Sequence, residues 1–284
     1  MRDDMTGTES GVGRTETATD RLDLRQVRHF QATLDREPTL NEGDPLPLFW
    51  QYLYFNPRIR ASELAEDGHE RLGRFVPDLG LPRRMWAGGG LEIAKPLLIG
   101  ETARKVSTIR GIERKTGRSG DLAFVTITHD YDVDGEHRFT ETQNVVYRQP
   151  PAPDAPTPAP KPAPDGAMFT REIRPDPVLL FRYSALIFYG HRIHYDSDYT
   201  RNVEGYPDLV VHGPLTATLL MDLGADHLDG RLVTGVSIRA MSPLFANTPF
   251  HLEGTDTGEA IDLWARGPQD QCAMSVELRF EGSE

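Results

Sequence analysis

Alternating apolar and polar side chains, enriched in β-branched residues, predict two sets of strands along the chain. In the first half the predicted strands are residues 90–99, 101–114, 121–133 and 138–148. In the second half they are residues 178–183, 232–241, 249–256, 259–266 and 271–280. Short segments with Gly, Asp or Pro separate most of these strands, as expected for turns. Each half should therefore form an antiparallel meander.

Helical spacing of apolar residues occurs once in each half. Residues 23–34 place apolar side chains three or four positions apart, which predicts an amphipathic helix. Residues 213–223 are apolar on nearly every side, which is typical of a helix surrounded by protein. A weak repeat relates residues 94–102 to residues 241–249, since both place Pro-Leu and an apolar residue before a turn. These features predict two related α+β units, each with a sheet wrapped around one central helix.

A proline-rich segment divides these two units. Eight of the 22 prolines fall within one short stretch, where they alternate with Ala and polar residues. Such a run cannot form a hydrogen-bond ladder and has no side chains for a core. Residues 149–166 are therefore predicted to be a solvated linker between a domain at residues 21–148 and a domain at residues 167–284.

The N-terminal segment and the overall charge restrict the location and the partners of the protein. Residues 1–20 are polar and acidic, unlike a secretory signal or a transit peptide, and are predicted to be a disordered leader. A net charge of −12 gives no electrostatic reason to bind nucleic acid or a membrane surface, so neither is an expected partner. No apolar run approaches the roughly 20 residues that span a bilayer. The single cysteine, Cys272, cannot form an internal disulfide or a thiolate zinc site, so it is predicted to be a small core residue in a reducing cytoplasm.

Candidate chemistry is concentrated in one segment of the second half. His191, His194 and His212 lie within 22 residues, in the same segment as Tyr189 and Asp196. Imidazole titrates near neutral pH and is the usual group for proton transfer at that pH. Catalysis is therefore expected in this segment.

The residues alone leave other roles open. His191 and His194 could ligate zinc, but no third ligand has suitable spacing and no His-Glu-x-x-His motif occurs, so no metal is expected. His212 could cap or buttress the following helix instead of acting in catalysis. At the start of that helix, Gly213-Pro214 leaves backbone N–H groups that a developing oxyanion can use.

Two short blocks in this segment resemble the MaoC-like dehydratase/hydratase family. Ala185-Leu186 and His194-x-Asp196 match the first block in spacing, and Val211-His212-Gly213 matches the second. Longer motifs are similar to a two-domain subgroup that includes mesaconyl-C4-CoA hydratase, itaconyl-CoA hydratase and the type 2 hydroxyacyl-thioester dehydratases. These motifs are LPRRMWAGG at 81–89, HRIHYD at 191–196, EGYPDLVVHGPL at 204–215 and LWARGP at 263–268. Apart from the linker, the resemblance covers nearly everything from about residue 21 onward.

The resemblance implies a double hot-dog fold, in which each half wraps an antiparallel sheet around a helix and the halves pair as a pseudo-dimer. It places the catalytic histidine of the family on His194 and the motif asparagine on His191. The catalytic aspartate of the family falls on Tyr189, so this chain departs from the simple Asp/His pair. The resemblance leaves three candidates for the missing group: His191, Asp196, or Tyr189 acting by orienting the water.

The implied enzyme is a hydro-lyase that reversibly hydrates an α,β-unsaturated acyl-CoA, with mesaconyl-type and itaconyl-type dicarboxylic acyl groups as candidates. Coenzyme A is part of the substrate, and no redox cofactor is needed. His194 is the expected base and acid, His191 its partner, and the Gly213 N–H the donor to the thioester oxygen. Expected contacts to the substrate or to these groups come from Arg192, Arg239, Arg266, Thr218, His212 and Trp86.

Three further expectations concern specificity, alternative functions and assembly. Arg182 or Arg192 could bind the second carboxylate of a dicarboxylic acyl group. A hot-dog thioesterase is one alternative, for which the central helix offers only Asp222, and a non-catalytic acyl-CoA-binding subunit is another, because Tyr189 replaces an aspartate. The first half lacks a His-x-x-His-x-Asp motif and is expected to be a degenerate partner that closes the acyl or pantetheine tunnel. A homodimer of such chains is also expected.

Overall fold

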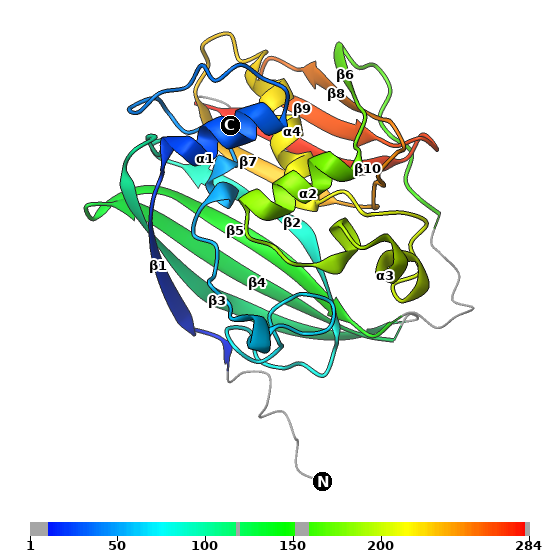
Figure 1. Cartoon of the computed structure of the whole chain (residues 1–284). Helices are drawn as coiled ribbons and strands as arrows, with labels where there is room; N and C mark the ends of the chain where they lie inside the picture. Colours follow the sequence, from blue (N-terminus) through cyan, green and yellow to red (C-terminus); the bar gives the residue numbers. More distant parts are fainter. Residues whose placement is uncertain (1–10, 118–119, 151–158, 282–284) are drawn as a thin grey trace.

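The computed structural model describes residues 11–117, 120–150 and 159–281, and its ten strands form one antiparallel sheet (Figure 1). The spatial order of the strands is β1-β3-β4-β5-β2-β7-β10-β9-β8-β6. Strands of the first half are β1 (Thr15–Arg21), β2 (Arg83–Ile93), β3 (Thr102–Gly117), β4 (Gly120–Val133) and β5 (Glu136–Arg148). Strands of the second half are β6 (Phe169–Ile173), β7 (Val233–Ala240), β8 (Phe250–Asp256), β9 (Ala260–Arg266) and β10 (Cys272–Phe280).

In the part of the chain that the structure describes, four α-helices and three short 3-10 helices accompany this sheet. They are α1 (Leu24–Thr33), α2 (Pro177–Leu186), α3 (Ser197–Asn202), α4 (Gly213–Ala225), η2 (Trp50–Leu53), η3 (Ala61–Glu63) and η4 (Arg192–His194). Among the described residues, none of the helices has the length and apolar character required to cross a membrane.

The predicted central helix of the second half is α4, which packs against β8, β9 and β10. Every residue from 215 to 224 is buried, as the uniformly apolar sequence of this segment predicts. Gly224 allows this close packing, because a Cβ atom there would lie 2.6 Å from the Leu278 side chain and 2.8 Å from the Leu263 side chain. The sheet of the second half therefore wraps around one buried helix.

The first half, within the described ranges, has no α-helix as long as α4. Its helix α1 packs against α2 of the second half, and the two lie side by side in Figure 1. The aromatic segment after α1 forms the short helix η2, whose Phe49 cap has φ 70°, a left-handed conformation that is costly for an aromatic residue. Phe49 and Trp50 are nevertheless only 2% exposed, so burial of large rings offsets the local backbone strain.

Strands β2 and β7 join the two halves into one continuous sheet. Gly88, Gly89 and Gly90 of β2 lie between β5 and β7. A Cβ atom would come within 1.8 Å of the Thr142 carbonyl oxygen at Gly89 and within 2.2 Å of the Ile238 carbonyl oxygen at Gly88. The glycine run in the LPRRMWAGG motif therefore permits close approach of backbones at the junction.

The structure corrects two boundaries of the predicted domains. The predicted leader, residues 1–20, overlaps β1, which pairs with β3; residues 1–10 lie outside the described residues. The predicted linker, residues 149–166, lies partly outside the described residues, but its C-terminal part packs against the second half. The Ala163 N–H donates to the Asp270 carbonyl oxygen at 2.8 Å, and Ala163 packs in a small cluster with Trp264 and Cys272. Cys272 is buried, as predicted.

One predicted strand, residues 178–183, is wrong, because this segment belongs to helix α2. The Asp176 side chain caps the helix by accepting a hydrogen bond from the Leu179 N–H at 2.7 Å, and Pro177 occupies its first turn. The buried residues of α2 are Leu180, Tyr183 and Ser184, which follow the helical period. Exposed apolar side chains near these positions made the sequence resemble the continuous apolar run of a buried strand.

Replacing Gly89 with alanine should destabilise the junction between the halves, because φ is 155° and a Cβ atom would collide with the Thr142 carbonyl. We expect a loss of about 3 kcal/mol in the free energy of unfolding, measured by urea denaturation. Gly111→Ala in β3 is the matched control, since a Cβ atom there meets nothing within 4 Å; its effect should stay within about 1 kcal/mol. Equal effects of the two substitutions would contradict this view of the junction.

Candidate active site

His194 is held in one orientation and one protonation state by the segment that precedes α4. Its Nδ1 lies 2.7 Å from the Val210 carbonyl oxygen, and the Val210 N–H donates to the Ile193 carbonyl oxygen at 2.9 Å. Because a carbonyl only accepts, Nδ1 must carry the proton, which leaves the lone pair of a neutral ring on Nε2. Burial lowers the pKa of His194 to about 4. The imidazole is therefore a neutral base at physiological pH.

His212 supports the His194 ring from one side. The two rings stack with their centroids 3.6 Å apart and an interplanar angle of 16°. His212 Nε2 lies 2.8 Å from the Ser184 hydroxyl, and the residue is only 1% exposed. Its side chain makes no capping hydrogen bond to α4. These contacts favour the buttress role over the predicted substrate contact.

Gly213 begins helix α4 beside Trp86 of the first half. A Cβ atom at Gly213 would lie 2.8 Å from the Trp86 ring, so only glycine fits without moving the indole. Within the described residues, nothing accepts a hydrogen bond from the buried Trp86 Nε1 or from the Gly213 N–H. A helix N-terminus with a free N–H is a favourable place for developing negative charge. The structure thus brings two of the predicted residues together with a free donor.

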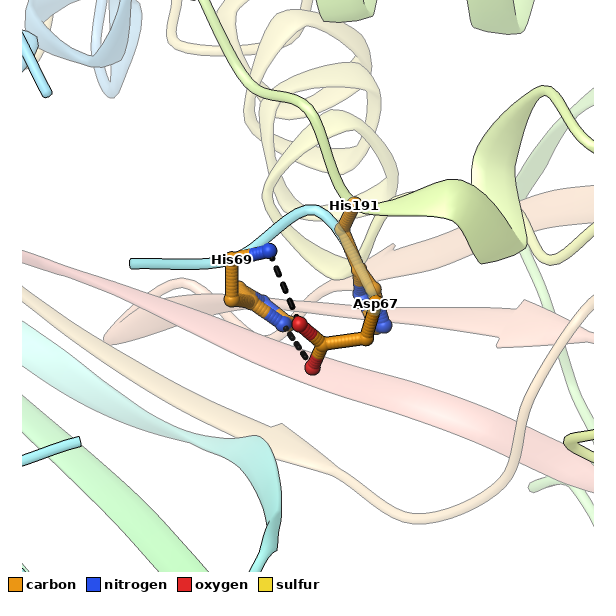
Figure 2. Close-up of side chains that lie close together, drawn as sticks. All are labelled: Asp67, His69 and His191. Carbon is orange, nitrogen blue, oxygen red and sulfur yellow. Dashed lines mark hydrogen bonds and ion pairs between the residues drawn. The ribbon is translucent and has the colours of Figure 1, made fainter. Parts of the chain in front are cut away.

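A loop from the first half brings two further side chains to residues 189–196, the proposed catalytic segment. His69 Nδ1 lies 2.8 Å from Asp67 Oδ2, and His69 Nε2 makes a short hydrogen bond with the Tyr189 hydroxyl. Figure 2 shows the Asp67 carboxylate against His69, with the His191 side chain beside them. The Asp67 and His69 side chains lie about 120 residues before Tyr189 in the sequence. The site is therefore built from both halves of the chain.

Backbone contacts fix this loop against the catalytic segment. A Cβ atom at Gly68 would lie 1.8 Å from the Gly190 carbonyl oxygen, and Gly68 has φ 83°. The Arg192 N–H donates to the Asp67 carbonyl oxygen at 2.8 Å, and the Arg192 guanidinium donates to the Glu66 carbonyl oxygen at 3.2 Å. The position of His69 thus depends on a glycine that allows close approach and on hydrogen bonds from Arg192.

His191 lies between the loop and His194. Its ring centroid is 3.8 Å from that of His69 and 5.4 Å from that of His194. Ligand atoms of Asp67, His69 and His191 all lie within 4.8 Å of one another, a spacing that a metal ion could use. Both nitrogens of His69 are already hydrogen-bonded, so a metal at His69 would have to displace Asp67 or Tyr189. The observed contacts therefore favour a hydrogen-bonded cluster.

The electrostatics of this cluster keep its rings neutral. Burial, reinforced by His69 and His194, lowers the pKa of His191 to about 2. Burial also lowers the pKa of His69, although its hydrogen bond to Asp67 opposes the shift. For Asp67, burial acts to raise the pKa, but the hydrogen bonds from His69 outweigh it and the net pKa is lowered. Asp67 is therefore a carboxylate beside neutral imidazoles.

The Tyr189 hydroxyl is also uncharged. Although 38% of the residue is exposed, the hydroxyl points to buried His69, and burial raises the pKa of Tyr189 to about 12. The ring centroid of Tyr189 lies 5.9 Å from that of His194. The hydroxyl that stands in the position of the family aspartate is therefore a neutral group near the base.

Arg84 of β2 contributes positive charge to the same region. Burial has the largest effect on the pKa values of three nearby groups: it lowers those of His69 and His191 and raises that of Tyr189. The positive charge of Arg84 acts in addition and lowers all three pKa values. Its guanidinium donates to the Glu70 carbonyl oxygen at 2.6 Å. Its side chain also hydrogen-bonds with Tyr147, and among the described residues no carboxylate forms an ion pair with it. Arg84 therefore carries a positive charge that no described carboxylate balances.

Several predicted site residues have structural partners instead. The Asp196 carboxylate caps α3 by accepting from the Tyr199 N–H at 3.0 Å and pairs with Arg192 at 2.7 Å. These contacts favour structural roles for both residues, and the predicted acid/base role of Asp196 and substrate contact of Arg192 stay predictions. Arg266 is likewise engaged by Glu253, at 2.9 Å, and by Asp270, and its predicted contact with coenzyme A stays a prediction.

The remaining two predicted contacts lie in different settings. The Thr218 hydroxyl is buried and donates to the Pro214 carbonyl oxygen at 2.8 Å, a contact within α4 that does not involve the histidines. Arg239 is exposed on β7 and makes no ion pair with any described residue. Of the three arginines proposed for coenzyme A, Arg239 alone has no carboxylate partner among the described residues.

Comparison with known proteins decides the family. A family model described as hydroxyacyl-thioester dehydratase type 2 matches residues 49–246. The chain belongs to this family. It is 45% identical to mesaconyl-C(4)-CoA hydratase of Chloroflexus aurantiacus, over 95% of this chain and 97% of that protein. It is 27% identical to the mitochondrial hydroxyacyl-thioester dehydratase type 2 of Schizosaccharomyces pombe, over 76% of this chain and 78% of that protein.

Family membership confirms the predicted resemblance and the predicted class of enzyme, a hydro-lyase. Solved structures confirm the predicted double hot-dog fold. A Mycobacterium tuberculosis protein described as having this fold superposes with a TM-score of 0.60 at 11% identity, covering 96% of each chain. The matched region of the family model contains both the Asp67–His69 loop and the His194 segment.

Three site residues escaped prediction from the sequence, namely Asp67, His69 and Arg84. Arg84 lies in the recognised LPRRMWAGG motif, which was a usable signal. Asp67-Gly68-His69 has the composition of a turn, and no local pattern shows that it meets Tyr189.

Lowering the pH should reduce the free energy of unfolding through His194. Its pKa is about 4 in the folded protein and about 6.5 for an unperturbed imidazole. Between those pH values the unfolded chain binds more protons, so stability is complete above about pH 6.5 and is lost as the pH falls towards 4. At pH 5 the shifted pKa of His194 should lower the free energy of unfolding by about 2 kcal/mol relative to neutral pH, measured by urea unfolding.

The His194→Gln variant should lose this part of the pH dependence. His137→Gln removes an exposed imidazole at the start of β5 and should leave the dependence unchanged. An identical pH dependence for the wild-type chain and His194→Gln would mean that His194 is not a buried neutral base.

Proposed function

We propose that this chain catalyses the reversible addition of water to an α,β-unsaturated acyl-CoA, with a mesaconyl-type dicarboxylic thioester as its substrate. The observation that carries the proposal is the fixed neutral tautomer of His194, whose Nε2 is free to act as a base. The relative from Chloroflexus aurantiacus, named for mesaconyl-C(4)-CoA hydration, supports the acyl group.

The proposed reaction uses the groups around the start of α4. His194 Nε2 removes a proton from water as the water oxygen bonds to the β-carbon. The electron pair of the C=C bond moves towards the thioester carbonyl, and its oxygen receives a hydrogen bond from the Gly213 N–H. His194 then returns the proton to the α-carbon, so the net result is the addition of one water molecule. The chemistry of these residues requires no metal or redox cofactor.

Arg84 supports a dicarboxylic acyl group. Its charge acts on Tyr189, His69 and His191, and no described carboxylate pairs with it. A second carboxylate on the acyl group would complete a charge-assisted pair there. Arg182, the alternative from the sequence, is exposed on α2, and Arg192 is already paired with Asp196. We therefore assign the carboxylate of the acyl group to Arg84.

The alternative of a thioesterase has less support. Asp222, the one acidic residue of α4, pairs with Arg36 at 3.0 Å and accepts from Trp50 Nε1 at 3.1 Å. These contacts occupy the carboxylate that would have to activate water at the thioester carbonyl. The location in the cytoplasm, the homodimer, and binding of the phosphates of coenzyme A by Arg239 stay predictions.

Incubation with mesaconyl-CoA, itaconyl-CoA and crotonyl-CoA should yield a product heavier by one water for at least the first thioester, detected by mass spectrometry. His194→Ala should lower kcat by about 10²–10⁴-fold, the usual contribution of a positioned acid/base group. Release of free coenzyme A would indicate hydrolysis, and binding without turnover would indicate a carrier subunit. Near wild-type hydration by His194→Ala would refute the assignment of the base.

Arg84→Gln should shift specificity away from dicarboxylic thioesters. We expect kcat/KM for mesaconyl-CoA to fall about 10²-fold relative to that for crotonyl-CoA, since loss of a partly buried charge partner costs about 3 kcal/mol. Arg25→Gln, at an exposed position on α1, is the control and should leave the ratio unchanged. Equal losses in kcat/KM for the two substrates would show that Arg84 does not bind the second carboxylate.

A further inference from the structure

Two hydrogen bonds join Asp67, His69 and Tyr189 into a relay. This relay suggests a replacement for the missing family aspartate. We propose that Asp67 and His69, supplied by the first half, position the Tyr189 hydroxyl so that its oxygen holds the reacting water against His194. This inference rests on the proposed hydration reaction. Asp67 and His69 act through Tyr189 and are positioning residues, whereas Tyr189 touches the water.

The direction of each hydrogen bond follows from the Asp67 carboxylate. One of its oxygens accepts from the His69 backbone N–H at 2.9 Å, and the other lies 2.8 Å from His69 Nδ1. A carboxylate beside Nδ1 holds the ring proton there, so His69 Nε2 carries the lone pair. Nε2 must then accept from the Tyr189 hydroxyl. The proton of Tyr189 is thereby directed to His69, and the oxygen lone pairs are left to accept a hydrogen bond.

A lone pair on Tyr189 and a lone pair on His194 Nε2 together suit a single water molecule. The water donates one hydrogen to the Tyr189 oxygen and the other to His194 Nε2, while its own lone pair faces the β-carbon. As the C–O bond forms, His194 takes the second proton and later returns it to the α-carbon. Tyr189, His69 and Asp67 do not change their protonation states, so the step balances without another reactant.

The surroundings keep this arrangement in place. Gly68 packs against the Gly190 carbonyl oxygen, and the Arg192 N–H binds the Asp67 carbonyl oxygen. The phenol of Tyr189 stays protonated, because burial raises its pKa to about 12. The ion pair with Asp196 orients the Arg192 side chain, which donates to the Glu66 carbonyl oxygen and so joins the first-half loop to the catalytic segment.

The test is a double-mutant cycle on hydration of mesaconyl-CoA with His69→Gln, Tyr189→Phe and the double variant. Tyr189→Phe should lower kcat about 10²-fold, as for loss of one positioned hydrogen-bonding group, and His69→Gln should lower it about 10-fold, both with little change in KM. In the Tyr189→Phe background, His69→Gln should have no further effect, because its influence passes through the lost hydroxyl. Asp67→Asn provides a second, nearly isosteric variant, expected to behave like His69→Gln.

A half-buried histidine outside the proposed site provides the control. His129 of β4 lies 2.8 Å from the Ser107 hydroxyl through its Nδ1, and His129→Gln should leave kcat unchanged. An equal fall in kcat on adding His69→Gln to either background would assign His69 a general structural role and overturn the relay. So would full activity of both His69→Gln and Asp67→Asn.

Two further outcomes distinguish the relay from a metal site and from a chain without hydratase activity. If wild-type protein contains a stoichiometric metal ion that His69→Gln loses, Asp67, His69 and His191 form a metal site and the relay is overturned. If the wild-type chain adds no water to any of the three thioesters, the proposed function and the relay both fail. Hydration by the wild-type chain with additive effects in the cycle would overturn the relay alone.

Discussion

The hydrogen bond from His194 Nδ1 to the Val210 carbonyl oxygen determines the chemistry available to this site. It fixes one tautomer, and burial against His212 makes the charged form costly, so the ring remains a neutral base. The lone pair of the neutral ring is then on Nε2, which no described residue hydrogen-bonds. The buried helix α4 begins at Gly213, whose N–H has no described acceptor, and we propose this N–H as the donor to the developing oxyanion.

The second constraint is that neither half of the chain completes the site alone. The glycines of β2 bring β2 and β7 together, and Gly68 lets a first-half loop contact Gly190. Through these close approaches the first half contributes Trp86, Arg84 and the Asp67–His69 pair. The first half, expected to be a degenerate partner, thus supplies polar groups as well as a wall of the site.

Local patterns predicted those features that depend on neighbouring residues. The apolar run at 213–223 predicted α4, and the motif spacing identified His194, because both signals are contained within one segment. The contact between His69 and Tyr189 spans 120 residues and depends on how the two halves pair, so no spacing could reveal it. Residues 178–183 were mistaken for a strand, because exposed Val178 and Phe181 lie between the buried positions of a helix. The structural roles of Asp196 and Arg266 depend on their ion-pair partners, which the sequence does not show.

Nitrogen-15 NMR of the histidine side chains is the sharpest test of His194 as a neutral base, because the shifts distinguish the two neutral tautomers from the imidazolium. At pH 7 we expect neutral rings protonated on Nδ1 for both His194 and His69, assigned by loss of their signals in His194→Gln and His69→Gln. An imidazolium, or a proton on Nε2 of His194, would contradict this mechanism, since the site would then have no base facing the water.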